Sequence, residues 1–419
     1  MTIPQGYKWT ELGIIPEDWE VKQISDFTTV VTGGTPSTQH TEYWGGDIRW
    51  MNSGELNLKF VYDVEGRITE EGLHNSSTHV IPAECVLVGL AGQGKTRGTA
   101  AYNLVSLCTN QSIAAFLPTD KHSSLYLYYV IDSKYDYLRL LSSGDGGRGG
   151  LNKQILGTIN VVLPPIAEQR AIAEALSDVD GLIAALDKKI AKKRLLKQGT
   201  MQQLLTGKKR LPGFTDEWVN VQIKQLGKWS KGQPFSKDKI NRDGKNPCIH
   251  YGELFSYGEV IETIKSNTDI EPYVKSSGKD FVYHMKRKIK YVLFPASDVT
   301  PIGLGRCSAL NVKNVLLGGD IIILKLTKDC PAYISYVVNL NKQQIIDRVT
   351  GTTVKHINSN LLGEIKINIS TDIKEQQAIA TILSDMDKEI ADLEAQRDKY
   401  RLLKSGMMQK LLTGQIRLK

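Results

Sequence analysis

The sequence predicts a mixed α+β chain made of two similar halves, each a strand-rich head followed by a long helix. Residues 166–211 and 373–418 align at an offset of 207 without a gap and match at 27 of 46 positions. Both copies space their apolar residues in heptads, which is typical of long helices that pack on another helix. Short β-like runs lie between the copies, separated by clusters of Gly, Asn, Asp and Ser. Two near-identical arms and two divergent heads indicate two different recognition modules on one frame.

The repeat sets the expected domain boundaries. We place the first head at residues 1–160, the first arm at 161–207, the second head at 208–368 and the second arm at 369–419. The heads share short matches, such as Trp19 with Trp218 and residues 54–56 with 252–254. A linker that contains Pro212 and Gly213 joins the halves. Each head is expected to be an α+β domain with a strand-rich core.

Each arm is expected to be one helix with an a/d seam. Pro164 and Pro165 precede the first helix, and Gly207 and Gly414 follow the last periodic residues as stop signals. Since one chain must return to its start, we expect the two arms to form an antiparallel coiled coil. The alternative is that each helix packs on its own head. The seam residues are Ile172, Leu176, Ile183 and Leu186 in the first arm, and Ile379, Leu383, Ile390 and Leu393 in the second.

Composition limits the class of protein. The 419 residues are 41% hydrophobic and 23% charged, as in ordinary globular chains. No apolar run of about 18 residues is present and the N-terminus lacks a signal-peptide pattern, so we expect a cytoplasmic protein without a membrane span. The five cysteines are scattered, which argues against disulfides and zinc. The net charge of +8 permits a polyanionic partner, although residues 1–150 alone carry −6.

Two glycine-rich loops resemble nucleotide-binding motifs. Residues 89–96 fit G-x-x-x-x-G-K-[ST] and follow an apolar strand, but the motif also requires a helix directly afterwards, where this chain has Arg-Gly-Thr-Ala-Ala. Residues 144–149 fit G-x-G-x-x-G without a preceding strand. We expect both loops to allow close backbone approach to a ligand, with Lys95, Arg97 and Arg148 supplying charge. Solvated loops without a ligand are the plainer alternative.

No catalytic or metal-binding constellation is visible. Serine, histidine and aspartate are present, but none lies in a G-x-S-x-G or H-E-x-x-H context. The cations of the second head include the run at residues 286–290, which is more typical of a solvated face than of a phosphate contact. The residues therefore offer no nucleophile, acid–base or metal constellation. Two rival functions stay open: a nucleotide hydrolase that uses Gly89–Thr96, and an adaptor whose heads bind proteins.

Several motifs taken together resemble a known family. The opening at residues 11–21 (ELGIIPEDWEV), the segment 32–37 (TGGTPS), Asn110-Gln111 and residues 163–172 (LPPIAEQRAI) are similar to the specificity subunit of type I restriction-modification enzymes. The resemblance covers essentially the whole chain, and the combination of two heads with two repeated helices is what makes it specific. The second copy of the arm lacks the Pro-Pro pair.

The resemblance implies a DNA-binding subunit that has no catalytic activity and binds no cofactor of its own. Each head would recognise half of a split site in double-stranded DNA, with the helices as a ruler between the half-sites. Two methylation subunits, which bind S-adenosylmethionine, would dock on the repeated helices. The partner-binding helices are marked by Ile172, Leu176, Ile183 and Leu186 in the first arm, and by Ile379, Leu383, Ile390 and Leu393 in the second. Restriction subunits that use ATP and magnesium would complete the complex. A silent subunit with the same fold stays open.

Antiparallel arms would relate the heads by a pseudo-two-fold axis, so that both can face one side of a duplex. Arg, Lys and Asn side chains match the edges of bases in the major groove, which is why we choose loop residues of these types as DNA contacts. The candidates are Lys95, Thr96, Arg97, Arg148 and Asn152 in the first head, and Lys237, Arg242, Arg287, Arg306, Lys355 and His356 in the second.

Overall fold

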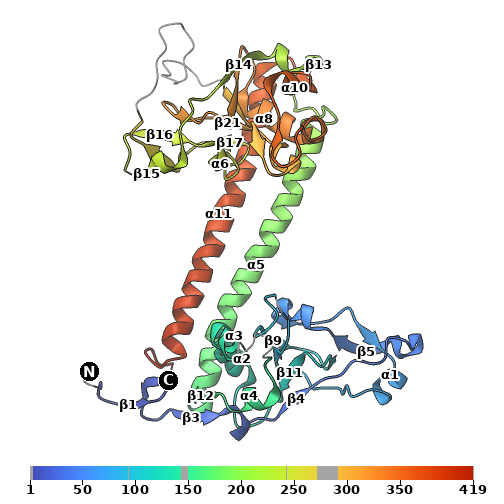
Figure 1. The fold of residues 1–419 in the computed structure, drawn as a ribbon, viewed down its shortest axis with the longest axis vertical. Coiled ribbons are helices and arrows are strands. Elements are labelled where there is room, and N and C mark those ends of the chain that lie inside the picture. Colours follow the sequence, from blue (N-terminus) through green and yellow to red (C-terminus); the bar gives the residue numbers. More distant parts are fainter. Residues whose placement is uncertain (1–2, 93, 143–149, 242, 271–290, 419) are drawn as a thin grey trace. The chain divides into compact units, whose positions relative to one another are not determined.

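The computed structural model describes residues 3–92, 94–142, 150–241, 243–270 and 291–418 (Figure 1). The chain divides into two compact units, and each unit contains parts of both arms. Unit 1 comprises Met1–Asp187 and Gln396–Lys419, and unit 2 comprises Lys188–Ala395. The arms are α5 (Ile166–Leu204) and α11 (Ile373–Leu411), as the sequence predicts. Each unit therefore combines one head with segments of both arms.

The head of unit 1 is an α+β domain with small accessory sheets. Its strands are β1 (Tyr7–Thr10), β2 (Gly13–Pro16), β3 (Glu20–Gln23), β4 (Val30–Thr32), β5 (Trp44–Met51), β6 (Phe60–Val61), β7 (Arg67–Ile68), β8 (Val86–Gly89), β9 (Ala100–Asn103), β10 (Cys108–Thr109), β11 (Ile113–Phe116) and β12 (Asn160–Leu163). Its helices are η1 (Ile24–Asp26), η2 (Thr41–Tyr43), η3 (Ser53–Leu58), α1 (Glu70–His74), α2 (Ser124–Ser133), α3 (Tyr135–Leu141) and α4 (Lys153–Gly157).

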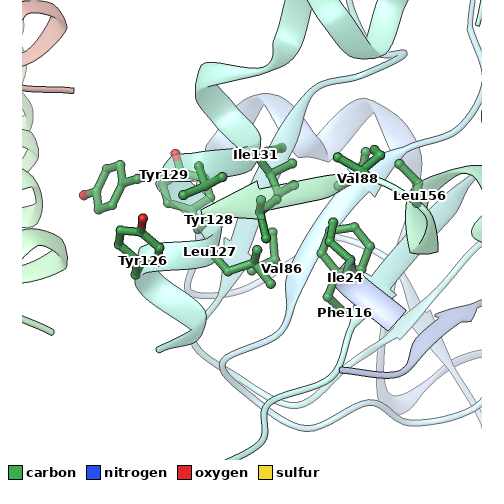
Figure 2. Close-up of a cluster of buried hydrophobic side chains, with 14 of the residues drawn as sticks. Ile24, Val86, Val88, Phe116, Tyr126, Leu127, Tyr128, Tyr129, Ile131 and Leu156 are labelled. Carbon is green, nitrogen blue, oxygen red and sulfur yellow. The ribbon is translucent and has the colours of Figure 1, made fainter. Parts of the chain in front are cut away.

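The central sheet of unit 1 has the strand order β4-β11-β8-β9-β6. Strands β8, β9 and β11 are buried along their whole length because both faces of the sheet are covered. Side chains alternate between the faces, so Val86, Val88 and Phe116 join one apolar core while Leu87 and Ala115 join another. Figure 2 shows the first of these cores, where the aromatic helix α2 lies against the sheet.

The head of unit 2 has a similar set of elements. Its strands are β13 (Trp218–Gln222), β14 (Gly227–Lys231), β15 (Ile240–Asn241), β16 (Asn246–Ile249), β17 (Val260–Ile261), β18 (Ser266–Thr268), β19 (Tyr291–Pro295), β20 (Ser297–Asp298), β21 (Ser308–Leu310), β22 (Leu316–Leu317), β23 (Ile321–Leu326), β24 (Lys355–His356) and β25 (Lys366–Ser370). Its helices are η4 (Ile223–Gln225), η5 (Lys237–Lys239), α6 (Tyr251–Leu254), α7 (Pro301–Leu304), α8 (Pro331–Leu340), α9 (Lys342–Ile346) and α10 (Ser359–Gly363).

The central sheet of unit 2 repeats the topology of unit 1. Its order is β14-β23-β19-β21-β17, with the same pattern of antiparallel partners around a parallel edge strand. Alternate residues again enter two cores, with Val292 and Phe294 on one face and Leu293 on the other. The faint sequence matches between the heads therefore reflect one fold used twice.

The arms begin and end where the sequence signals lie. Glu168 and Gln169 donate their backbone N–H groups to the carbonyl of Pro165 in the first turn of α5. Gly207 and Gly414 follow the last turns with φ of 72° and 71°, the left-handed conformation that commonly terminates a helix. Figure 1 shows α5 in green and α11 in red as continuous helices.

The arms pack antiparallel within each unit. In unit 1, the start of α5 and the end of α11 share a core with the head, and Lys404 lies 2.7 Å from Asp180. In unit 2, the end of α5 shares a core with the start of α11, and Lys193 lies 2.7 Å from Glu389. Ile172, Leu176, Ile379 and Leu383, which the sequence suggests for the seam, are buried in these head cores. Ile390 and Leu393 are also buried, and Ile183 and Leu186 are half-buried.

Candidate nucleic-acid interface

Two loops of unit 1 that carry candidate DNA contacts lie side by side. One connects β8 to β9, and the other precedes α4. The backbone N–H of Leu151 donates to the carbonyl of Leu90 at 3.2 Å, which joins the two loops. Lys95, Thr96, Arg97 and Asn152 thereby lie in two adjoining segments at the end of the inner strands β8 and β9. Arg148 lies outside the described residues.

The β8–β9 loop does not have the geometry of a phosphate-binding loop. That motif requires a helix after the glycines, whereas here the chain turns back at Gly98 into the antiparallel strand β9. Gly89 is needed for the turn itself, because a Cβ there would lie 2.2 Å from the carbonyl oxygen of Thr96. The nucleotide-hydrolase alternative therefore lacks the helix N-terminus that would bind phosphates.

The β8–β9 loop is held in shape by helix α3. Arg139 donates to the carbonyl of Gly94 at 2.7 Å, and the Tyr135 hydroxyl donates to the carbonyl of Lys95 at 3.2 Å. Arg97 uses its guanidinium within the fold, where it donates to the Ser142 hydroxyl at 3.2 Å. The Lys95 side chain is exposed. Lys95 is thus presented on a fixed loop, whereas Arg97 mainly supports that loop.

Unit 2 has an equivalent pair of adjoining segments, but their side chains differ from those of unit 1. The backbone N–H of Ile357 donates to the carbonyl of Ala296 at 3.0 Å, as Leu151 does to Leu90 in unit 1. Strand β24, which contains Lys355 and His356, pairs with β20 next to this contact. His356 is exposed, and Lys355 donates to the carbonyl of Gly351 at 2.7 Å. Lys237 is exposed on η5, apart from these loops.

Two of the candidate DNA contacts have clear structural roles. Arg306 donates to the backbone carbonyls of Phe255 and Tyr257, and burial lowers the pKa of its guanidinium. Asn152 caps helix α4 by accepting from the N–H of Ile155 at 2.9 Å, and Asn358 caps α10 in the same way. Arg242 and Arg287 lie outside the described residues.

The sequence reasoning overlooked apolar residues at the same place. In the segment between β19 and β21, Val299, directly after β20, and Ile302, in the short helix α7, are each 74% exposed. This loop is the counterpart of the one that carries Lys95, and both follow the central strand of their sheet. The signal available in the sequence was that these apolar residues lie among polar and turn-forming neighbours, such as Asp298, Thr300 and Gly303. The two heads thus present a cationic loop in unit 1 and an apolar one in unit 2.

Each unit is fastened by the same buried ion-pair cluster. In unit 1, Glu168 is 4% exposed and accepts from the indole N–H of Trp19 at 3.0 Å and from Arg417 at 2.6 and 2.7 Å. In unit 2, Glu375 is fully buried and accepts from Trp218 at 3.3 Å and from Arg210 at 2.7 and 2.9 Å. The glutamates and arginines correspond at the repeat offset. Each arginine follows the end of one arm and fixes it to the start of the other.

The unit 1 cluster should make stability depend on acid pH. Burial raises the pKa of Glu168, but hydrogen bonds from Arg417 and Trp19 and the charge of Arg417 outweigh it and lower the pKa below its usual value. A carboxyl group with a lowered folded-state pKa stabilises the fold above its unfolded pKa of about 4.3, and this contribution is lost as pH falls through the folded-state pKa. The free energy of unfolding in urea, measured between pH 5 and 3, should therefore depend less on pH in Glu168→Gln than in the parent chain. Equal slopes would contradict this assignment.

A second repeated cluster fixes each head to the arms. The Tyr129 hydroxyl donates to Asp180 at 2.9 Å in unit 1, and Asp180 also pairs with Lys404. In unit 2, the Tyr336 hydroxyl donates to Asp387 at 2.6 Å, and Asp387 pairs with Lys197 at 2.5 Å. These contacts attach helix α2 or α8 of each head to both arms. The arms therefore carry the heads through the same side chains in both units.

The described residues contain no group of three or more His, Cys, Asp or Glu side chains that could hold a metal ion. All five cysteines are free thiols, and burial raises the pKa of Cys85 and Cys307 to about 12, which makes neither a ready nucleophile. Among the described helices, none is long and apolar enough to cross a membrane.

Comparison with known proteins gives the same family in both halves. The family model for the type I restriction modification DNA specificity domain matches residues 16–193 and again 215–400. The chain is 35% identical to the MjaIX specificity subunit of Methanocaldococcus jannaschii over 42% of this chain and 41% of that one. It is 24% identical to the MjaVIII specificity subunit of the same organism, over 97% of this chain and 94% of that one.

A solved structure shares the fold along the whole chain. The type I restriction-modification S subunit from M. genitalium superposes with a TM-score of 0.66 and 13% identity, covering 98% of both chains. The low identity means that this likeness concerns the fold alone. A second chain, solved in work on assembly of the type I system, gives a TM-score of 0.50 at 15% identity over 96% of this chain and 99% of that one.

Proposed function

Because this chain belongs to the type I restriction-modification DNA specificity family, we propose that it reads two unlike half-sites of duplex DNA and carries two methylation subunits. As a specificity subunit, it recognises DNA sequence for a type I restriction-modification system. The finer proposal rests on one observation: two heads of the same topology present different loops, while identical arm residues hold both heads. Different loops suit different half-sites, and a repeated frame suits two copies of one partner.

The equivalent loops after β8 and β19 are our candidates for reading bases. Lys95 supplies a cation in unit 1, whereas His356 and the exposed Val299 and Ile302 line the same place in unit 2. Lysine can contact guanine O6 and N7, and apolar side chains can contact the thymine methyl group, so the loops would favour different sequences. Phosphate contacts elsewhere would position each head without specifying bases.

The partners supply the chemistry in this proposal. We place S-adenosylmethionine on the methylation subunits, and ATP and magnesium on restriction subunits, in the cytoplasm where host DNA lies. This chain would contribute the choice of site. The adaptor alternative would require the loops to bind proteins, and a steep dependence of duplex binding on salt would count against it because protein docking lacks counterion release.

The direct test is modified-base sequencing of a host genome. The chain is co-expressed with its cognate methylation subunit, and a matched culture expresses the methylation subunit alone. We expect a split motif of two unlike half-sites, methylated only when this chain is present. Exchange of the β8–β9 loop for that of a relative should change one half-site and leave the other. A soluble complex that methylates no new motif would contradict the proposal.

A further inference from the structure

Two motifs of the sequence lie together at one end of the central sheet of unit 1. Residues 32–37 continue from strand β4, and residues 110–111 precede strand β11. Strand β11 pairs antiparallel with both β4 and β8, so its start lies beside the ends of these two strands. The β8–β9 loop leaves the sheet at the same end, where the backbone N–H of Leu90 donates to the carbonyl of Ser112 at 2.8 Å. Both motifs therefore border the loop that carries Lys95.

Exposed side chains of the two motifs are joined by a hydrogen bond. The hydroxyl of Thr35 donates to the amide oxygen of Gln111 at 2.6 Å, and both residues are exposed. Such a bond contributes little to the free energy of folding, since water offers both groups equivalent partners. Its effect is on the amide itself, because the oxygen is held at Thr35 and the NH2 group lies on the side away from it. The bond thus sets the orientation of a solvent-exposed side chain.

The backbone on each side of this hydrogen bond is closely held. A Cβ at Gly33 would lie 1.9 Å from the carbonyl oxygen of Thr109, so the chain before Thr35 passes directly against β10. The N–H of Gly34 donates to the same carbonyl at 2.9 Å. On the other side, the turn at residues 110–113 is closed by two hydrogen bonds, at 3.0 and 3.2 Å. A side chain held in this way loses little conformational freedom when a ligand binds, which favours specific recognition.

The oriented amide matches one base in the major groove. Glutamine can donate its NH2 group to N7 of adenine while its oxygen accepts from the N6 amino group. The oxygen of Gln111 has a second lone pair for this contact, because the hydroxyl of Thr35 uses only one. Lys95, on the adjoining loop, suits guanine instead. This end of the sheet therefore presents two neighbouring side chains with different base preferences.

Unit 2 has a glycine at the equivalent place. Gly319 lies two residues before β23, as Gln111 lies two residues before β11. The carbonyl of the next residue, Asp320, accepts from the N–H of Ala296 at 2.9 Å, which repeats the backbone contact of unit 1. A Cβ at Gly319 would lie 2.9 Å from the Cα of Pro234, so a larger residue would displace the chain. The two heads thus differ at this position, as recognition of unlike half-sites requires.

We infer that Gln111, oriented by Thr35, reads an adenine of the half-site that unit 1 binds, and the inference rests on the function proposed above. Gln111 makes the base contact, and Thr35 is a positioning residue that acts through it. A phosphate group fits this pair less well. Phosphate oxygens only accept hydrogen bonds, so they would use the NH2 group and leave the oriented amide oxygen without a donor from the DNA.

The experiment measures discrimination at each base pair of the target. Modified-base sequencing with the parent complex supplies the split motif. The purified complex with its methylation subunit is then titrated with duplexes in which each base pair of that motif is replaced in turn. The variants are Gln111→Ala, Thr35→Val, which removes the hydroxyl, and Thr35→Ser, which keeps it. Gln5→Ala is the matched control, because Gln5 is also an exposed glutamine of unit 1 but lies in the N-terminal segment before β1.

We expect the parent complex to lose about 5- to 150-fold in affinity when one particular A·T pair is replaced. Gln111→Ala should lose most of this discrimination at that pair and keep the parent's discrimination at every other pair, including the whole second half-site. Thr35→Val should show a smaller loss at the same pair, because the amide is present but no longer oriented. Thr35→Ser and Gln5→Ala should match the parent.

An unchanged profile in Gln111→Ala would overturn the inference, and so would equal weakening on all duplexes, which is the behaviour of a phosphate contact. Loss of discrimination at a G·C pair would overturn the assignment to adenine. A profile of Thr35→Val identical to that of the parent would overturn the positioning role of Thr35. A parent complex that yields no split motif would overturn the proposed function, and this inference with it.

Discussion

Replacing Arg417 by alanine should lower the free energy of unfolding of unit 1 by about 3–5 kcal/mol, the usual cost of removing one partner of a buried ion pair. Among the described residues, the substitution leaves the buried carboxylate of Glu168 with the Trp19 indole and the backbone N–H of Leu418 as its remaining donors. Arg417 also binds Asp18 at 2.7 and 2.9 Å and lies over the Trp19 ring, so its loss weakens the attachment of the chain end to the first head.

Hydrogen exchange with peptide resolution is the suitable measurement, because it separates the two units. We expect faster exchange in peptides of β3, β12 and the start of α5, with unit 2 unchanged. Arg401→Ala is the matched control, since Arg401 is half-exposed and pairs with the half-exposed Asp187, a kind of pair worth less than about 1 kcal/mol. If the same peptides are protected from exchange equally well in Arg417→Ala and in Arg401→Ala, the cluster of Glu168, Trp19 and Arg417 does not stabilise unit 1.

The same reasoning applies to Arg210 in unit 2, where the partner carboxylate of Glu375 is fully buried. The repeat thus contains two copies of the same buried ion-pair cluster. In unit 1 the ion pair of Glu168 and Arg417 joins residues that are 249 positions apart, and in unit 2 the pair of Arg210 and Glu375 joins residues 165 positions apart. The chain ends lie in unit 1, where the Tyr7 hydroxyl donates to the carbonyl of Gly414 at 3.0 Å.

The arms and their termini could be predicted from the sequence because helix signals are local. Pro165 and the two terminal glycines act within one turn, and heptad spacing needs only neighbouring residues. The pairing of Glu168 with Arg417 could not be predicted in this way, because nothing local links residues so far apart. A signal did exist: both residues recur at the repeat offset as Glu375 and Arg210, which indicates a shared structural role.

The heads were predictable as α+β domains, but their strand order was not. The residues near a short strand do not indicate which distant strand it pairs with. Residue type also failed to separate surface contacts from structural ones. Arg306 has the side chain of a DNA contact, yet it bonds to buried backbone carbonyls, a use that depends on tertiary packing. By contrast, Lys95 on the β8–β9 loop and His356 on β24 are both exposed, as a DNA contact requires.

The assignment of seam residues shows why periodicity alone cannot name a contact surface. Heptad spacing predicts that one face of each helix is buried but does not say against what. Ile172 and Leu176 pack into the first head, and Ile379 and Leu383 into the second. Leucines outside the seam, such as Leu195 and Leu402, are exposed, and heptad spacing alone does not indicate this.

Replacing Phe116 by alanine should lower the free energy of unfolding of unit 1 by about 3–5 kcal/mol, the typical cost of deleting a buried phenyl ring. Phe116 is fully buried in β11, between β4 and β8. Figure 2 shows it with Ile24, Val86 and Leu127 in the core below α2. Because the β8–β9 loop connects two strands of the central sheet, the loss of packing should also make the position of Lys95 less well defined. Urea unfolding followed by hydrogen exchange in β4, β8 and β11 would measure the effect.

Tyr62→Ala serves as the comparison, because Tyr62 is 71% exposed and its truncation should change stability by less than about 0.5 kcal/mol. Phe294→Ala, at a fully buried position in β19, should reproduce the large effect in unit 2. Equal loss of protection in both units after Phe116→Ala would contradict the division into two compact units. A loss confined to unit 1 would mean that one head can vary in sequence, and so in the half-site that we propose it reads, without disturbing the packing of the other.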